Sequence, residues 1–156
     1  MTTGPTVYGF VDEYAFLTNF YPSPIVVWDM EFPTVEHAYQ AFKSTDNDRF
    51  ERIRTAATPG IAFRMGAQVP TSQYRKNWLR NREQHMYALL VAKFTQHEDL
   101  AEQLIATHPS NLVHANQFGE NFWGIVNNKG TNMLGLQLMH IRQRFVDGEL
   151  TTGDQS

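Results

Sequence analysis

The chain has 156 residues, of which 42% are hydrophobic and 19% charged, and its formal net charge is −3. This is enough apolar material for the core of one domain and too much for a disordered chain. The apolar runs are too short for a transmembrane helix, the N-terminus lacks the features of a secretory signal, and the absence of cysteine excludes disulfides, thiolate metal sites and a cysteine nucleophile. We expect a single cytoplasmic domain over residues 1–156, with its core at about 7–146 and loose ends.

The first third of the chain predicts short strands and turns. Residues 7–10 and 25–32 are rich in β-branched and aromatic side chains, and the sequence YPSP at 21–24 is typical of a turn between them. The proline at position 33 keeps the second strand from continuing directly as helix.

The rest of the chain reads mainly as helix. Thr34 is a good N-cap, and Thr58 is followed by a proline in the first helical position. The expected helices are 34–44, one from 46 or 47, one from 58, then 80–96, 98–107 and 131–146, with a strand at 111–116. Because helices outnumber strands and do not alternate with them, we expect an α+β fold, a predominantly helical single domain with a few short strands.

Positive charge is concentrated in the middle of the chain. Residues 43–93 contain ten Lys and Arg against four Asp and Glu, a net +6 in a protein that is acidic overall. This pattern is typical of a local site for phosphate groups, and equally of solvated helix faces with mixed charge. The interpretation of the chain as a nucleic-acid-binding protein in its own right rests on this segment alone. It would require binding to DNA or RNA that depends steeply on salt.

Three polar residues fall on one face of the first expected helix. Glu36, Gln40 and Lys43 are separated by four and three residues, so an acid, an amide and an amine lie in line. Such a row suits proton transfer beside a nucleophilic amine. It also fits an ordinary surface ladder of weak side-chain pairs.

A second candidate wall of a pocket is the sequence ENFWGIVNNKGTN at 120–132. Glu120 precedes Trp123 by three residues, and the loop leads into the last expected helix, whose free N–H groups near Thr131 and Asn132 would favour an anion. The alternative is a capped helix start with Trp123 in the core.

Trp78 is the third candidate, because it lies among the cations Arg75, Lys76 and Arg80. A tryptophan among cations is a usable platform for a base with its phosphates, and core packing of the ring is the alternative. The six histidines show no metal-ligand spacing, so we expect no metal site.

These residues resemble a known family. NFYPS at 19–23, PTVEHAYQAFK at 33–43, Trp78 with Met86, Lys93 with Phe94, NFWG at 121–124 and GTNMLGLQLMHIR at 130–142 follow the order and spacing of the NADAR family of YbiA-like N-glycosidases. The similarity runs from about residue 8 to residue 144, and several blocks in register make it specific.

The resemblance implies a YbiA-like fold and hydrolysis of an N-glycosidic bond between a ribose and a base or amine. The substrate would be a ribosylamino-pyrimidine phosphate or ADP-ribose attached to guanine in DNA or RNA, cleaved without cofactor, metal or membrane. In some members a lysine is thought to form a Schiff base with the opened ribose. Carried onto this chain, the catalytic residues would be Lys43, Glu36 and Glu120. Substrate-binding residues would be Asn19, Phe20, Tyr21, Gln40, Trp78, His114, Trp123, Gly124 and Asn132.

The chain departs from the family pattern at three positions. His114 stands where members commonly have glutamate, Glu120 replaces an aspartate, and Asn77 replaces an acid before the tryptophan. These departures leave a second interpretation, a non-catalytic module that binds NAD or ADP-ribose to sense or sequester it. In the enzymatic interpretation Glu36, Lys43, Trp78, Glu120 and Trp123 are expected to converge on one cleft, with Glu36 protonated during part of the cycle.

Overall fold

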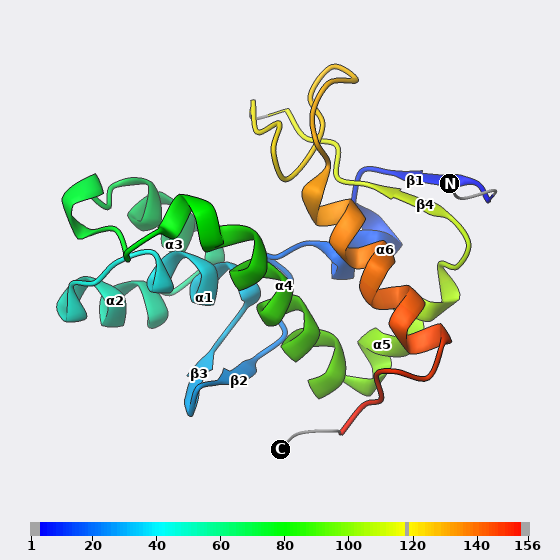
Figure 1. Ribbon diagram of the computed structural model, residues 1–156, viewed down its shortest axis with the longest axis horizontal. Coiled ribbons are helices and arrows are strands. Elements are labelled where there is room, and N and C mark those ends of the chain that lie inside the picture. Colours follow the sequence, from blue (N-terminus) through cyan, green and yellow to red (C-terminus); the bar gives the residue numbers. More distant parts are fainter. Residues whose placement is uncertain (1–3, 118, 154–156) are drawn as a thin grey trace. The chain divides into compact units, whose positions relative to one another are not determined.

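The computed structural model describes residues 4–117 and 119–153, which form two compact units (Figure 1). One unit is Asn19–Lys93, and the other combines Met1–Thr18 with Phe94–Ser156. Helices dominate both units and the strands are three residues long, so the predicted α+β, mainly helical fold class is confirmed. Within the described residues, no helix is both long and apolar enough to cross a membrane.

The unit Asn19–Lys93 begins with a hairpin. β2 (Ile25–Val27) pairs antiparallel with β3 (Met30–Phe32), placing Ile25 opposite Phe32. Trp28 and Asp29 form the turn with φ of 49° and 62°, both left-handed. The prediction of one continuous strand over 25–32 is wrong, because this turn lacks the Asn-Gly or Asp-Gly pair that usually marks it.

Three helices follow: α1 (Val35–Phe42), α2 (Asn47–Arg54) and α3 (Pro59–Ala67). The predicted starts at Thr34 and Thr58 are confirmed, and Asp46 caps the helix expected from 46 or 47. Each cap side chain accepts a hydrogen bond from the backbone N–H three residues later, Thr34 from His37, Asp46 from Arg49 and Thr58 from Ile61. Each cap satisfies one of the unpaired N–H groups at a helix start, which typically contributes about 1 kcal/mol.

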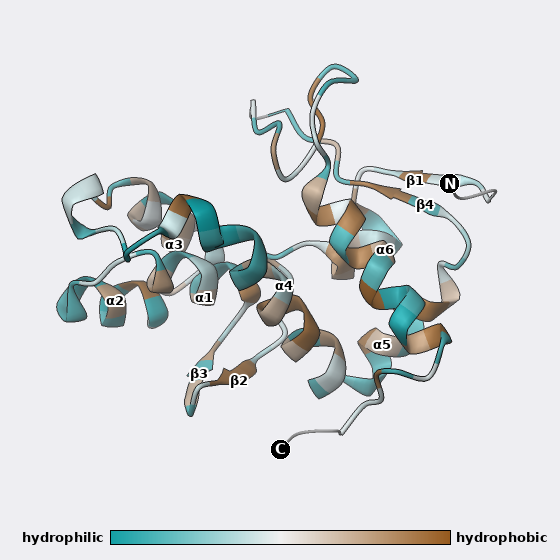
Figure 2. Cartoon of the chain, in the orientation of Figure 1, coloured by the Kyte–Doolittle hydropathy of each residue, from teal (hydrophilic) through white to brown (hydrophobic). Residues whose placement is uncertain are grey.

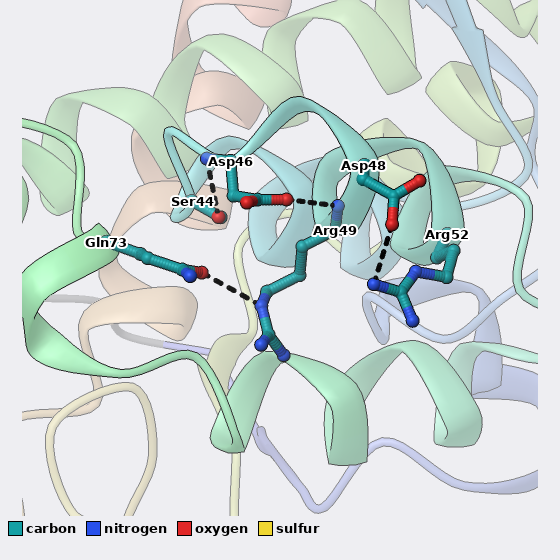
Figure 3. A network of polar contacts seen from close by, with 6 residues as sticks. All are labelled: Ser44, Asp46, Asp48, Arg49, Arg52 and Gln73. Carbon is teal, nitrogen blue, oxygen red and sulfur yellow. Dashed lines mark hydrogen bonds and ion pairs between the residues drawn. The ribbon is translucent and has the colours of Figure 1, made fainter.

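A polar network holds α2 against the segment that leads into α4 (Figure 3). Ser44 Oγ accepts the N–H of Asp46 at 3.1 Å, and Arg49 Nε donates to Gln73 Oε1 at 2.9 Å. Arg52 pairs with Asp48 on the exposed side of α2 at 2.8 Å. The network fixes the end of α1 beside the short 3-10 helix η2 (Thr71–Gln73).

The long helix α4 (Trp78–Gln96) changes character along its length. Its first turns are hydrophilic and its later turns hydrophobic, as the change from teal to brown in Figure 2 shows. Met86, Leu89 and Leu90 are buried, as the predicted stripe requires. The helix starts two residues earlier than the sequence predicts.

The second unit contains a parallel strand pair and two packed helices. β1 (Thr6–Tyr8) pairs with β4 (Asn111–Val113) in the register Val7 to Leu112, and the 3-10 helix η1 (Asp12–Leu17) follows β1 in the chain. The strands lie side by side in Figure 1. Both are shorter than predicted, because the ladder ends where Gly9 N–H bonds Val113 O.

Helices α5 (Glu98–Ala106) and α6 (Met133–Val146) complete this unit. Leu134, Leu138 and Ile141 of α6 are buried, as their spacing predicts. The expected loose ends stay a prediction; in the described part of the C-terminal end, Glu149 N–H bonds Arg144 O at 2.8 Å, and Gly153 N–H bonds Thr95 O at 2.9 Å. The remaining terminal residues of that expectation lie outside the described ones.

Candidate active site

Glu36 is a buried carboxyl group in the first turn of α1. Glu36 is only 6% exposed, and Gln40 Nε2 donates to Glu36 Oε2 at 2.7 Å. Burial raises the pKa of Glu36 from 4.5 to about 7, although the Gln40 hydrogen bond and the Lys43 charge act in the opposite direction. The surface-ladder interpretation of this row is therefore wrong for Glu36 and Gln40, and Glu36 exchanges a proton near neutral pH.

Two buried acceptors beside Glu36 lack a partner. Glu36 N–H donates to the backbone oxygen of Asn19 at 3.1 Å, which brings the 19–21 segment to the start of α1. Among the described residues, the buried Oδ1 of Asn19 and Oε1 of Gln40 accept no hydrogen bond. Because a buried polar atom without a partner is costly, these two oxygens suit the hydroxyl donors of a sugar.

Lys43 lies at the C-terminal end of the same helix and is partly exposed. Its Nζ donates to Gly66 O of α3 at 3.1 Å and lies 5.1 Å from the centre of the Tyr74 ring. Arg75 braces this end, because its N–H bonds Lys43 O and its Nε donates to Phe42 O, at 2.9 and 2.8 Å. The amine thus contacts a backbone carbonyl and an aromatic ring.

Gly66 lets α3 approach α1 at this point. A Cβ at position 66 would collide with the side chain of Gln40, including its Oε1. The absence of a side chain thus allows the Gly66 carbonyl to reach Lys43 and the Gln40 amide to reach Glu36.

We expect Gly66→Ala to lower the free energy of unfolding by about 1–3 kcal/mol, the usual effect of overpacking, and to reduce turnover by displacing Gln40. Chemical denaturation and steady-state kinetics measure the two effects. Gly60→Ala on the same helix is the control, since a Cβ there has no neighbour closer than 3.8 Å. Equal stability and activity in both variants would contradict the close approach.

The other predicted residues of this unit have mixed settings. Phe20 is 43% exposed and its ring lies 6.3 Å from that of Phe63. Tyr21 lies with its ring 5.9 Å from Nζ of Lys93. Lys93 is fully buried, and burial lowers its pKa from 10.5 to about 7. A lysine of lowered pKa is the type of group used as an amine nucleophile, but Lys93 is less exposed than Lys43, which is partly exposed.

Trp78 is mainly a core residue. Trp78 is 4% exposed, and the centre of its ring lies 5.1 Å from that of Tyr39 and 5.2 Å from that of His85. Little of the ring remains free for stacking. Trp78 nevertheless lines two shallow depressions of about 490 and 340 Å³, whose further walls come from residues 74–80 and from Trp28, Asn81, Gln84, His85 and Ala88.

In the other unit, Glu120 has a structural task. Its Oε1 accepts the N–H of Phe122 at 2.7 Å, and its Oε2 accepts the N–H of Trp123 at 3.0 Å. The carboxylate thus holds the turn that presents the half-buried Trp123. Glu36 and Lys43 lie in one unit and Glu120 and Trp123 in the other, so a cleft shared by all of them stays a prediction.

The predicted anion site at the start of α6 is wrong in its premise. The N–H groups of Asn132, Met133 and Leu134 donate to the carbonyls of Gly124, Phe122 and Trp123 at 3.2, 2.9 and 3.0 Å, in that order. These N–H groups are therefore already paired within the loop.

Asn132 and Gly124 shape the loop backbone. The Asn132 side chain accepts the N–H of His114 at 2.9 Å and donates to Leu112 O at 3.0 Å, which ties α6 to β4. A Cβ at Gly124 would collide with His114 O. Asn132 thus holds the His114 backbone, and the glycine at 124 allows the chain to pass close to it.

His114 is partly buried, and its ring stacks on Phe10 at 5.4 Å. Burial lowers the pKa of His114 from 6.5, although the Glu120 charge acts to raise it, and its buried Nδ1 has no partner in the described part of the chain. At neutral pH the imidazole is therefore uncharged.

Sequence reasoning missed His37, which fixes the start of α1. Its Nδ1 pairs with Thr34 Oγ1 and its Nε2 with Ala56 O, both at 2.9 Å. Burial lowers the pKa of His37, so the neutral ring donates from Nε2 and accepts at Nδ1. In the sequence, its position directly after Glu36 could have pointed to this role. In the described residues, no cluster of three or more His, Asp or Glu is arranged to hold a metal ion.

The protein has a mainly helical α+β fold that carries a buried carboxyl group and a lysine on one helix. The family model of the NADAR domain matches residues 8–146, and the chain belongs to this family. It is 40% identical over 139 residues to N-glycosidase YbiA of Shigella flexneri, covering 88% of this chain and 86% of that protein.

Two further comparisons agree. A riboflavin biosynthesis protein of Vibrio vulnificus is 35% identical over 136 residues, which are 86% of this chain and 36% of that longer protein. The solution structure of the Escherichia coli protein YbiA superposes with a TM-score of 0.80 at 37% identity, covering 92% of this chain and 85% of that one. The resemblance predicted from the sequence motifs is confirmed.

Proposed function

We propose that this protein is an N-glycosidase that releases ribose or ADP-ribose from an exocyclic amine, with Lys43 as covalent nucleophile and Glu36 as proton carrier. Relatives named N-glycosidase support the bond type. A relative named for riboflavin biosynthesis supports a ribosylamine as one substrate class. The observation that carries the mechanism is the buried Glu36 carboxyl, titrating near pH 7 on the same helix face as a lysine amine.

The chemistry starts with opening of the ribose. Protonated Glu36 gives its proton to the ring oxygen as the C1′–O4′ bond breaks, and the lone pair of the amine nitrogen forms a protonated imine, an iminium ion, with C1′. The lone pair of the Lys43 amine adds to C1′, and the nitrogen loses a proton to the Glu36 carboxylate. That proton passes to the leaving nitrogen, whose bond to C1′ breaks, and a Lys43–ribose imine remains.

Water completes the cycle. It adds to the carbon of the protonated imine. Of its two protons, one goes to Nζ as the C1′–Nζ bond breaks and the other restores protonated Glu36, and the sugar leaves as an aldehyde that closes to a ring. The sum is substrate plus water giving free amine plus ribose, with no oxidant or reductant. The first step requires a lone pair on the leaving nitrogen, which a pyridinium nitrogen lacks, so the route favours exocyclic ribosylamines over a pyridinium glycoside such as NAD.

The direct test is product release by the purified protein from three compounds: a ribosylamino-pyrimidine phosphate, DNA with ADP-ribose on guanine, and NAD. Release from one or both of the first two, with NAD intact, is the expected result. Binding of ADP-ribose without release from any of them would favour the second candidate, a non-catalytic binding module, which the replacement of glutamate by His114 suggests.

His114 provides a pH prediction within this function. Because its pKa is lowered, the imidazole gains its charge only below pH 6.5, and we expect the rate of the wild-type protein to change there. His114→Glu, whose carboxyl ordinarily titrates near 4.3, should lack that change. The measurement is kcat/KM from about pH 5 to 8. Superimposable profiles would place His114 outside the chemistry.

A further inference from the structure

Trp28 is an exposed tryptophan at a position where a bulky side chain is unusual. It occupies the turn between β2 and β3, its residue is 56% exposed, and its φ is 49°. Left-handed turn positions favour Gly, Asn or Asp, and a bulky residue there is strained. Strain of this kind together with exposure of a large apolar ring indicates that the ring serves something outside the unit's own core.

The ring is held by its neighbours in the unit Asn19–Lys93. It packs nearly at right angles to Phe42, with centroids 4.9 Å apart, and lies 5.6 Å from the His85 ring. Arg75 covers the same Phe42 ring at 5.6 Å. Trp28 therefore has a defined orientation and needs little ordering when a ligand binds, which favours affinity.

The surroundings of Trp28 carry positive charge. Trp28, Arg75 and Lys76 line the depression of about 340 Å³, and Arg75 and Lys76 continue into the one of about 490 Å³, which Arg80 also lines. No carboxylate lines either depression among the described residues, and the nearest in sequence is Asp29 in the turn. Lys76 and Arg80 are exposed.

We propose that Trp28 stacks on an unpaired base of a single-stranded nucleic acid, with Lys76 and Arg80 on the neighbouring phosphates. An aromatic platform beside a basic track is the usual means of holding a single strand. The inference extends the proposed function, because it takes the ribosyl adduct to be carried by a nucleic-acid strand. The strand would pass over residues 74–80, which adjoin Lys43 through the bond from Arg75 N–H to Lys43 O.

The form of the surface favours a strand over a free mononucleotide. The two depressions are shallow and share Arg75, Lys76 and Trp78, so they form one open track. Pockets for small molecules bury most of the ligand surface, which an open track does not do. A chain that passes over the surface needs only one stacked base and repeated phosphate contacts.

The test is binding of a fluorescent single-stranded DNA of about ten nucleotides, unmodified, to the whole protein, followed by anisotropy at several salt concentrations. Trp28→Ala should weaken binding about 5- to 100-fold, the effect of losing one stacked base, and Trp28→Phe should retain most of the affinity. Lys76→Ala should lower the slope of log affinity against log salt by about one.

The controls are Leu136→Ala and Lys129→Ala, which remove an exposed apolar and an exposed charged side chain that line neither depression. Equal affinity of Trp28→Ala and wild type, absence of strand binding at low salt, or equally tight binding of ADP alone would overturn the inference. Release of the amine from a free ribosylamine in the same preparation keeps the proposed function separate: it can succeed when strand binding fails, and fail when strand binding succeeds.

Discussion

Lys43→Ala should reduce release of the amine on the order of a thousand-fold or more. The reason is that the aldehyde carbon of an opened ribose forms an imine only with an amine, and Lys93, the other lysine considered above, is fully buried where Lys43 is partly exposed. The measurement is kcat on a ribosylamine substrate, with circular dichroism to confirm that the variant folds.

Two companion variants sharpen this result. Lys43→Arg keeps the length and charge of the side chain, but guanidinium stays protonated and cannot form the imine, so we expect nearly the same loss. Lys76→Ala removes a nearby exposed lysine and should keep its rate on a small ribosylamine within a few-fold of wild type, since Lys76 lies outside the row of α1. Near-normal kcat in Lys43→Ala would mean direct attack by water, with Glu36 as base.

Glu36→Gln should have the second largest effect, lowering kcat by about 10²- to 10⁴-fold, the usual contribution of a general acid and base. The amide keeps the size of the side chain and its contact with Gln40 while removing the exchangeable proton. In the wild-type protein, activity that needs protonated Glu36 should fall as the pH rises through about 7, the pKa to which burial raises this group. The residual activity of Glu36→Gln should lack that limb.

The same substitution should stabilise the fold above neutral pH. A carboxyl whose folded pKa exceeds its unfolded value binds more protons in the folded state, so its contribution to stability is lost as the pH rises from about 4.5 to about 7. Glu36→Gln avoids this loss, which amounts to at most about 3 kcal/mol. We therefore expect the variant to gain melting temperature over wild type at pH 8 and not at pH 4.5. A variant less stable at both values would contradict a buried, neutral-pH titration of Glu36.

Local signals made most of the fold predictable. The N-caps Thr34, Asp46 and Thr58 and the buried stripe of α6 follow from short-range chemistry that a sequence records directly. The hairpin at Trp28 did not, because its turn uses a residue that ordinarily avoids the left-handed region. The 3-10 helices at 12–17 and 71–73 lack a periodic apolar pattern and were missed for that reason.

The candidate site was predictable where residues share one helix. Glu36, Gln40 and Lys43 lie on α1 with the expected i, i+4, i+7 spacing, whereas the burial that changes the pKa of Glu36 depends on packing by distant segments. The same limit explains Trp78, which neighbouring cations suggested as a stacking surface and which the packing of Tyr39 and His85 makes part of the core. Trp28 is exposed instead, and no pattern of spacing distinguishes the two rings.

The most direct test of the central claim is reductive trapping of the covalent intermediate. The protein is incubated with a ribosylamine substrate and borohydride, which reduces an imine to a stable secondary amine, and the modified peptide is identified by mass spectrometry. We expect a ribosyl adduct on Lys43, absent from Lys43→Ala and from samples without substrate. An adduct on Lys93, or turnover with no trapped lysine at all, would contradict the assignment of Lys43 as the nucleophile.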